Sequence, residues 1–189
     1  MEYVDFQKEH AEMPMLNIGV GGNPGEFSGP DIFHIDLDRW NYRNCIQGDA
    51  IALPFRNDSF RSVVCGDVLE HMEDPLTALC EMHRVAPKIV LTTFQEWRLP
   101  GVGQFKEEGN KILARVDAAY IPYRENGTFL DAYPDSRVSH VPHINQWSRE
   151  WLLELFTAAR LIVESFKIIV SGIHEGNPLV NYLYLLRRA

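Results

Sequence analysis

Cysteine, membrane-length apolar runs and leader-like features are all scarce in this 189-residue sequence. The three cysteines, Cys45, Cys65 and Cys80, form no Cys-x-x-Cys pair. Their odd number argues against a disulfide framework and against a zinc site, so we expect no metal. No apolar run approaches the ~20 residues that a membrane-spanning helix needs. Residues 1–13 lack the basic start and apolar run of a secretory signal, so we expect a cytoplasmic protein without a membrane span.

Positive charge is also in short supply. The chain has 18 Lys and Arg against 26 Asp and Glu, which gives a formal net charge of −8. An acidic chain has no large positive field to attract phosphate backbones, so nucleic acid is not expected as a partner. Apolar residues make up 46% of the sequence, enough for a buried core. The length suits one domain spanning residues 1–189.

The pattern of apolar runs predicts an α/β fold. Residues 74 and 75 are a capping Asp followed by Pro, which marks a helix start. A second helix is expected to begin near Ser148, and residues 165–170 and 181–186 are expected to form a closing hairpin with a long loop. Five short, continuously apolar runs predict strands covered on both faces: residues 15–19, 32–36, 44–48, 62–65 and 89–94.

Two regions depart from an ordinary α/β pattern. The links at residues 20–31 and 37–43 are too short for the usual crossover helices, so one face of the sheet is expected to be thinly covered. A homodimer through that face is possible, unless the N-terminal segment or a long insertion covers it. The insertion, at about residues 95–146, is long, aromatic and irregular, and segments of this kind are often functional.

A ligand site is indicated where the first two strands end. Gly19 and Gly21 follow the first strand, and glycines there let the backbone turn tightly and approach a ligand closely. Asp36 ends the second strand, where an acid can accept hydrogen bonds from the hydroxyls of a ribose. The dinucleotide fingerprint fails because Pro24 occupies its third glycine position and no helix follows. A dinucleotide oxidoreductase is therefore disfavoured.

Further motifs follow in a fixed order. Gly48-Asp49 precedes Leu53-Pro54-Phe55, then come Leu69-Glu70-His71 and Glu81-x-x-Arg84-Val85. This ordered set resembles class I S-adenosylmethionine-dependent methyltransferases, most closely the branch with the ubiquinone- and menaquinone-type small-molecule enzymes. The resemblance covers about residues 15–94 and resumes at 147–166. It implies a Rossmann-like, mostly parallel seven-stranded sheet with an antiparallel last strand, here with reduced helices after strands one and two.

The resemblance also implies cofactor contacts. Asp36 would hold the ribose, Asp49 the adenine amino group, and the backbone at Cys65 and Gly66 the methionine amino group. Asn17 stands where the family usually has an acid. The full set of implied contacts with S-adenosylmethionine is Asn17, Gly19, Gly21, Asp36, Leu37, Asp49, Ala50, Cys65, Gly66 and Asp67.

The implied function is methyl transfer to a small-molecule acceptor. His71 and His143 are candidate catalytic residues on the acceptor side, since an imidazole titrates near neutrality. A packing role for His71 and a solvated loop for His143 stay open as alternatives. The alternative function is that of a cofactor-binding protein with this fold that acts as a non-catalytic partner subunit.

Overall fold

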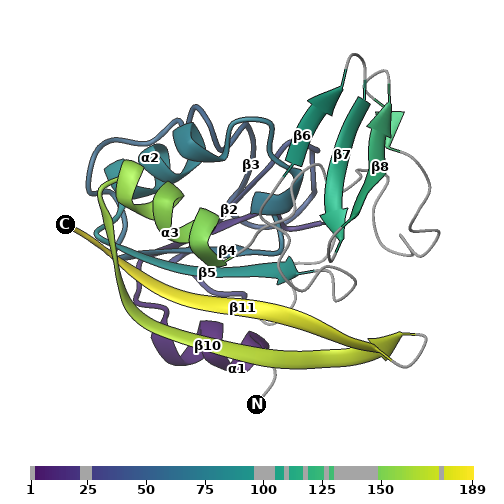
Figure 1. Ribbon diagram of the computed structural model, residues 1–189. Coiled ribbons are helices and arrows are strands. Elements are labelled where there is room, and N and C mark those ends of the chain that lie inside the picture. Colours follow the sequence, from purple (N-terminus) through teal and green to yellow (C-terminus); the bar gives the residue numbers. More distant parts are fainter. Residues whose placement is uncertain are drawn as a thin grey trace.

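The computed structural model describes residues 3–21, 27–95, 105–108, 111–116, 119–125, 128–129, 149–174 and 177–189. Its main sheet has seven strands in the order β10-β11-β5-β4-β1-β2-β3 (Figure 1). Strands β5, β4, β1, β2 and β3 pair in parallel, and β11 runs antiparallel to both of its neighbours. The predicted Rossmann-like sheet with an antiparallel last strand is therefore confirmed. The strands are β1 Met15–Ile18, β2 Ile32–Asp36, β3 Cys45–Gln47, β4 Ser62–Gly66, β5 Lys88–Gln95, β10 Leu161–His174 and β11 Asn177–Arg188.

The helices begin and end where local chemistry requires it. Helix α2, Pro75–Val85, starts after Asp74, whose side chain accepts a hydrogen bond from the backbone N–H of Thr77 at 3.0 Å. It ends before Pro87 because Ala86 adopts the extended backbone that a residue preceding proline favours. Helix α3, Arg149–Ala158, begins next to Ser148, as the sequence predicts.

Helices α2 and α3 cover one face of the sheet (Figure 1). Burial of this apolar core supplies most of the force that holds the two layers together. It joins inward side chains of the parallel strands to those of the two helices: Leu16, Ile18, Ile35, Val63, Ile89, Leu91, Ala78, Leu79, Met82, Leu152 and Phe156.

The opposite face is covered by helix α1, Tyr3–His10, which lies against β5 and β11. Phe6 is fully buried there and packs with Val90, Leu183 and Leu185. Residues 37–44, between β2 and β3, form no helix, and neither do the described residues 27–31 before β2. The lack of a helix after β2 is thus observed, and the described residues of the link after β1 form no helix either. Helix α1 covers part of the gap. The homodimer stays a prediction.

Two parts of the chain are more regular than expected. Strands β10 and β11 extend through most of the expected hairpin loop, to His174 and from Asn177. The insertion, expected to be irregular, contains a separate antiparallel sheet of order β6-β7-β8-β9 (Figure 1). Its strands are β6 Phe105–Glu108, β7 Lys111–Val116, β8 Ala119–Glu125 and β9 Thr128–Phe129. The role of this insertion within a single domain stays a prediction.

Candidate functional site

Backbone contacts join the carboxyl ends of β1, β2 and β3 at one edge of the sheet. The N–H of Gly19 donates to the carbonyl of Ile35 at 2.9 Å, and that of Gly48 donates to the carbonyl of Asp36 at 2.8 Å. The N–H of Gly21 donates to Oδ2 of Asp36 at 3.0 Å. Parallel strands end at the same edge, where α/β sheets bind ligands. The structure therefore brings Gly19, Gly21 and Asp36 together, as the sequence predicts.

The Asp36 carboxylate is fixed by two backbone donors. Besides the Gly21 contact, Oδ1 accepts from the N–H of Asp38 at 2.9 Å. An ionised carboxylate has about four acceptor sites. One contact on each oxygen orients the group and leaves each oxygen able to accept a further hydrogen bond. This geometry suits a ligand with two neighbouring hydroxyl groups.

The two glycines of the turn have different surroundings. Gly19 has φ +74°, and a Cβ atom there would lie 2.2 Å from Cγ2 of Val68. Gly21 has φ +60°, and a Cβ atom there would meet no atom of the described residues within 4 Å. Gly19 is therefore needed for packing against the start of the segment after β4. None of the described residues crowds Gly21, so a ligand can come close to the backbone there.

The turn after β3 carries Asp49 and Ala50. Asp49 is exposed, and its Oδ1 accepts from the N–H of Ile51 at 3.1 Å. Ala50 is buried, and Leu37, directly after β2, has 67% of its surface exposed. Because Leu37 is exposed and directly follows the oriented Asp36, its side chain can cover one face of a flat ligand.

Two residues of α2 bind the segment that follows this turn, and the sequence alone assigned them no role. Glu81 Oε2 accepts from the N–H of Leu53 at 2.9 Å. Arg84 donates to the carbonyls of Leu53 at 3.0 Å and Phe55 at 2.7 Å, and its Nε lies 2.6 Å from Glu81 Oε1. The signal was the Glu-x-x-Arg-Val motif, whose spacing places both side chains on one side of the helix. Glu81 and Arg84 thus link the Leu-Pro-Phe segment after Asp49 to α2.

We expect Glu81→Gln to lower stability near pH 7, and the deficit to shrink near pH 3. The hydrogen bond from Arg84 lowers the pKa of Glu81 below its ordinary value of 4.5. Its stabilising effect is therefore present above pH 4.5 and is lost as pH falls through the lowered pKa. Urea unfolding at both pH values measures this. Glu164→Gln, which breaks an exposed pair with Arg187, is the control and should change little. An equal deficit of Glu81→Gln at both pH values would contradict the assignment.

Asn17 pairs with a buried histidine on the neighbouring strand. Its Nδ2 lies 3.4 Å from Nδ1 of His34, and the two residues are register partners in β1 and β2. Burial lowers the pKa of His34 from its ordinary 6.5, which favours the neutral imidazole. An uncharged Asn is compatible with a neutral ring. This accounts for Asn17 at the position where the resembling family has an acid.

Asn17→Asp should raise the pKa of His34. A carboxylate beside the ring favours the imidazolium form. In the wild-type chain the folded pKa of His34 is low, so stability falls as pH drops below 6.5, and in the variant this loss should diminish or reverse. NMR titration of the ring signals measures the shift. The pKa of His83, which is also lowered mainly by burial, should not move. An unchanged pKa of His34 would contradict the contact.

At the end of β4, the backbone of Cys65 is available to a ligand and its thiol is not. Cys65 is fully buried in the α2-side core, and burial, followed by the Glu70 and Asp67 carboxylates, raises the pKa of its thiol. Cys65 therefore stays protonated, and only its backbone can serve a ligand. A Cβ atom on Gly66 would lie 2.5 Å from Nε2 of Gln7 in α1. Asp67 follows with φ +51°.

The two candidate catalytic histidines are placed differently. His71 ends the short 3-10 helix η1, Leu69–His71, and is half-buried, with its N–H donating to the carbonyl of Val68 at 3.0 Å. It lies beyond the end of β4, on the edge where the other site residues gather. His143 lies outside the described residues. The catalytic role of both stays a prediction.

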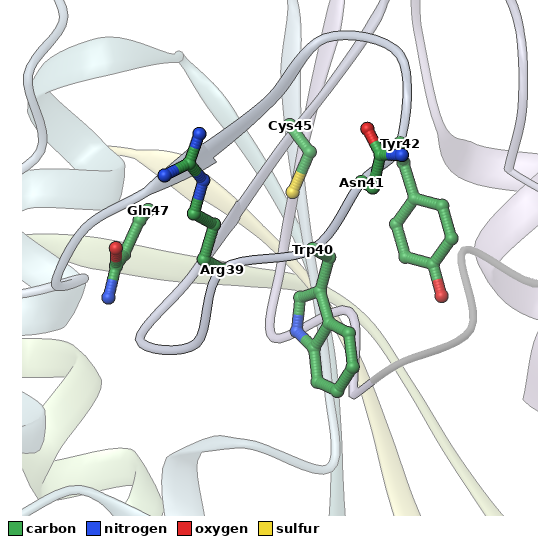
Figure 2. Close-up of a pocket in the computed structure, with 6 residues that line it drawn as sticks. All are labelled: Arg39, Trp40, Asn41, Tyr42, Cys45 and Gln47. Carbon is green, nitrogen blue, oxygen red and sulfur yellow. The ribbon is translucent and has the colours of Figure 1, made fainter.

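An open hollow of about 570 Å³ lies beside this edge, over β3 (Figure 2). Cys45 and Gln47 of β3 are register partners of His34 and Asp36, so they share the sheet face that carries His34. The hollow reflects the lack of a helix between β2 and β3, and none of the predicted cofactor contacts lines it. Its lining residues are Arg39, Trp40, Asn41, Tyr42, Cys45 and Gln47.

Metal and membrane features were searched within the described residues. They contain no group of three or more His, Cys, Asp or Glu side chains able to hold a metal ion. In the same part of the chain, no helix is both long and apolar enough to cross a membrane.

Comparison with known proteins places this geometry in a fold family. Residues 27–88, about a third of the chain, match a family model described as a methyltransferase domain. The whole chain superimposes on solved methyltransferases. A protein of Methanosarcina mazei, named as S-adenosylmethionine-dependent, shares 16% identity at a TM-score of 0.62, with 100% of this chain and 98% of that chain covered. The fold is that of the S-adenosylmethionine-dependent methyltransferases.

Two further structures share this fold. A Mesorhizobium loti S-adenosylmethionine-dependent methyltransferase matches at 13% identity and a TM-score of 0.62, covering 98% of this chain and 95% of that one. A Burkholderia thailandensis 1,6-didemethyltoxoflavin-N1-methyltransferase, solved with bound 1,6-didemethyltoxoflavin and S-adenosylhomocysteine, matches at 13% identity and a TM-score of 0.56, covering 99% of this chain and 76% of that one. No curated protein sequence gave a significant match. The family model and these structures support S-adenosylmethionine as the cofactor.

The residues at the sheet edge suit that cofactor. Asp36 has acceptor capacity for the two ribose hydroxyls, on a carboxylate already oriented by Gly21 and Asp38. Within the part of the chain that the structure describes, no side chain occupies the space beside the Gly21 backbone. One Asp49 oxygen accepts from Ile51, and the group keeps capacity for an adenine amino donor.

Proposed function

We propose that this protein is a methyltransferase that uses S-adenosylmethionine to methylate a small-molecule acceptor. The observation that carries the proposal is the Asp36 carboxylate, held at the carboxyl end of β2 by the backbone N–H groups of Gly21 and Asp38. The matched methyltransferase domain model, residues 27–88, supports it. When bound, the cofactor supplies a methyl group on a good leaving group, so the protein mainly aligns the reactants and excludes water.

The predicted contacts then have the following tasks, with Asp67 bordering the methyl-transfer site. Asp36 accepts hydrogen bonds from the ribose hydroxyls, and Asp49 accepts one from the adenine amino group, with Leu37 and Ala50 beside the ring. Gly19 and Gly21 shape the turn next to the methionine part, near Asn17. The backbone at Cys65 and Gly66 faces the amino group. Glu81 and Arg84 keep the Asp49 turn in place through Leu53 and Phe55.

We further propose that residues 95–146 form the acceptor side. The segment follows the carboxyl end of β5, on the edge where the other site residues lie, and includes the four strands β6 to β9. Replacing residues 104–130 by a short Gly/Ser linker should remove methyl transfer and change the Kd of S-adenosylhomocysteine by less than about threefold, because every described cofactor contact lies elsewhere. Calorimetry and a transfer assay measure the two effects. A collapse of cofactor affinity would show that the segment is structural.

The experiment that tests the function is an acceptor screen with methyl-labelled S-adenosylmethionine. Transfer of label to at least one small molecule is the expected result, and it should be lost in Asp36→Ala. Binding of the cofactor with no transfer to any acceptor would favour the alternative, a non-catalytic partner subunit. His71→Asn in the same assay tests whether His71 takes part in the reaction.

A further inference from the structure

An arginine without an acidic partner is the first residue of helix α3. The side chain of Arg149 is exposed, and its guanidinium carbon lies 4.9 Å from the centre of the Phe166 ring in β10. In the described part of the chain, no carboxylate lies within ion-pair distance of Arg149, although acidic residues outnumber basic ones by 26 to 18. A contact with an aromatic face leaves the N–H donors of a guanidinium able to bind an anion.

The chain itself offers little compensation for this charge. The N-terminus of a helix carries a partial positive charge, which disfavours a cation there. Glu150 follows Arg149 directly, but adjacent residues of a helix do not face each other. The nearby hydroxyl of Tyr184 supplies no negative charge, because burial raises its pKa and keeps it protonated. An exposed cation at this place fits a counter-charge that comes from a ligand.

Arg149 lies at the carboxyl edge of the sheet. Strand β10 runs in the same direction as β5, since both are antiparallel to β11. Helix α3 leads into the start of β10, so its first residue lies toward the carboxyl edge (Figure 1). One register line crosses β10, β11, β5 and β4 through Phe166, Tyr184, Leu91 and Cys65. The guanidinium over Phe166 is therefore level with the end of β4 and three strand spacings, about 14 Å, away from it.

The surface beside the guanidinium is apolar. Ile168 lies two residues after Phe166 on the same face of β10, and 56% of its surface is exposed. The rings of Phe166 and Tyr182 pack edge to face with their centres 5.6 Å apart, so aromatic side chains continue from β10 onto β11. An apolar strip that ends at an exposed cation matches a ligand with an apolar body and an anionic end.

We propose that Arg149 binds an anionic group, a carboxylate or a phosphate, at the end of the methyl acceptor that is remote from the methylated atom. This rests on the proposed function and names the chemical class of the acceptor. The methylated atom lies at the end of β4, and the apolar body crosses β11 toward β10. The guanidinium can pair with two oxygens of such a group. An acceptor with a cation at the same end is rejected by the like charge.

The experiment measures binding of four matched probes to the full chain saturated with S-adenosylhomocysteine. The probes are 3-phenylpropionate, 2-phenylethylphosphonate, 3-phenylpropanol and 3-phenylpropylamine, titrated by NMR. We expect the tighter of the two anions to bind at least about tenfold more tightly than the amine, with the alcohol between them. Arg149→Gln should reduce this preference to within about threefold. No preference in the wild-type chain, including no binding of any probe, or an unchanged preference in Arg149→Gln, overturns the proposal.

Arg160 provides a matched control at the other end of α3. It is also exposed and lies just before the start of β10, at the opposite edge of the sheet. Arg160→Gln makes the same change in net charge and should leave the preference unchanged. Equal losses in both variants would show a general effect of charge and would overturn the proposal.

Two further readouts separate binding from folding and from the proposed function. The Tm of Arg149→Gln should stay near that of wild type, because the loss of an exposed cation–π contact is offset by removing a cation from a helix N-terminus. A lost preference with a strongly lowered Tm would make Arg149 structural and would overturn the proposal. S-adenosylhomocysteine is titrated first by calorimetry. Failure of the wild-type chain to bind it would refute the proposed function, whereas binding without an anion preference would overturn only the role of Arg149.

Discussion

Asp36→Ala should weaken binding of S-adenosylhomocysteine at least tenfold. The carboxylate is already oriented by the N–H groups of Gly21 and Asp38, so it is ready to accept the ribose hydroxyls. Losing a hydrogen bond to a charged group costs on the order of 1.5–3 kcal/mol. Isothermal titration calorimetry measures the change in Kd.

Asp38→Ala is the matched control for that experiment. Asp38 is an exposed acid two residues further on, and it serves Asp36 through its backbone N–H, which alanine keeps. The Kd of the Asp38→Ala variant for S-adenosylhomocysteine should stay within about threefold of wild type, since removing an exposed surface charge has a small effect. Equal losses in both variants would mean that net charge, rather than the placed Asp36 carboxylate, governs binding.

Gly19→Ala should cause a large loss of folding stability. Left-handed backbone at φ +74° costs an L-residue about 1–2 kcal/mol. The added Cβ would also lie 2.2 Å from Cγ2 of Val68, and overpacking adds about 1–3 kcal/mol. We therefore expect a loss of about 2–5 kcal/mol in the free energy of unfolding, measured by urea denaturation.

Gly21→Ala separates the two causes. Gly21 has φ +60°, but a Cβ atom there would meet none of the described atoms within 4 Å. Only the backbone cost of about 1–2 kcal/mol should remain. The double variant Gly19→Ala, Val68→Ala should recover part of the loss, because it removes the atom in closest contact. Equal losses at Gly19 and Gly21 would contradict the packing account.

Local signals predicted most of the main sheet. The apolar runs that became β1, β2 and β4 are short and bounded by Gly, Pro or Asp, so their limits were found within about one residue. The Asp74-Pro75 pair that predicted the start of α2 is also a local signal. The lengths of β10 and β11 were not predictable in this way. Register shifts between Val163 and Ser165 and between Val170 and Gly172 interrupt the alternation on which a strand prediction depends.

The residues of the candidate site also fall into two groups, those that local signals predict and those that only long-range packing brings together. Gly19, Gly21 and Asp36 could be found because they directly follow predicted strands whose ends must meet at one edge. Asn181 could not be found, since it reaches Asp67 across 114 residues and only the placement of β11 beside β5 brings it near. Glu81 and Arg84 formed a visible motif, but their contacts with Leu53 and Phe55 depend on how α2 packs.

Titration of the wild-type chain with S-adenosylhomocysteine tests the central claim most directly. The edge formed by Gly21, Asp36 and Asp49 predicts saturable one-to-one binding that is not displaced by NAD, since the dinucleotide fingerprint fails at Pro24. Calorimetry should show heat of binding with a midpoint near equimolar ligand, and the same titration of Asp36→Ala should be shifted to at least tenfold weaker affinity. No binding by the wild-type chain, or binding that NAD displaces, would contradict the account.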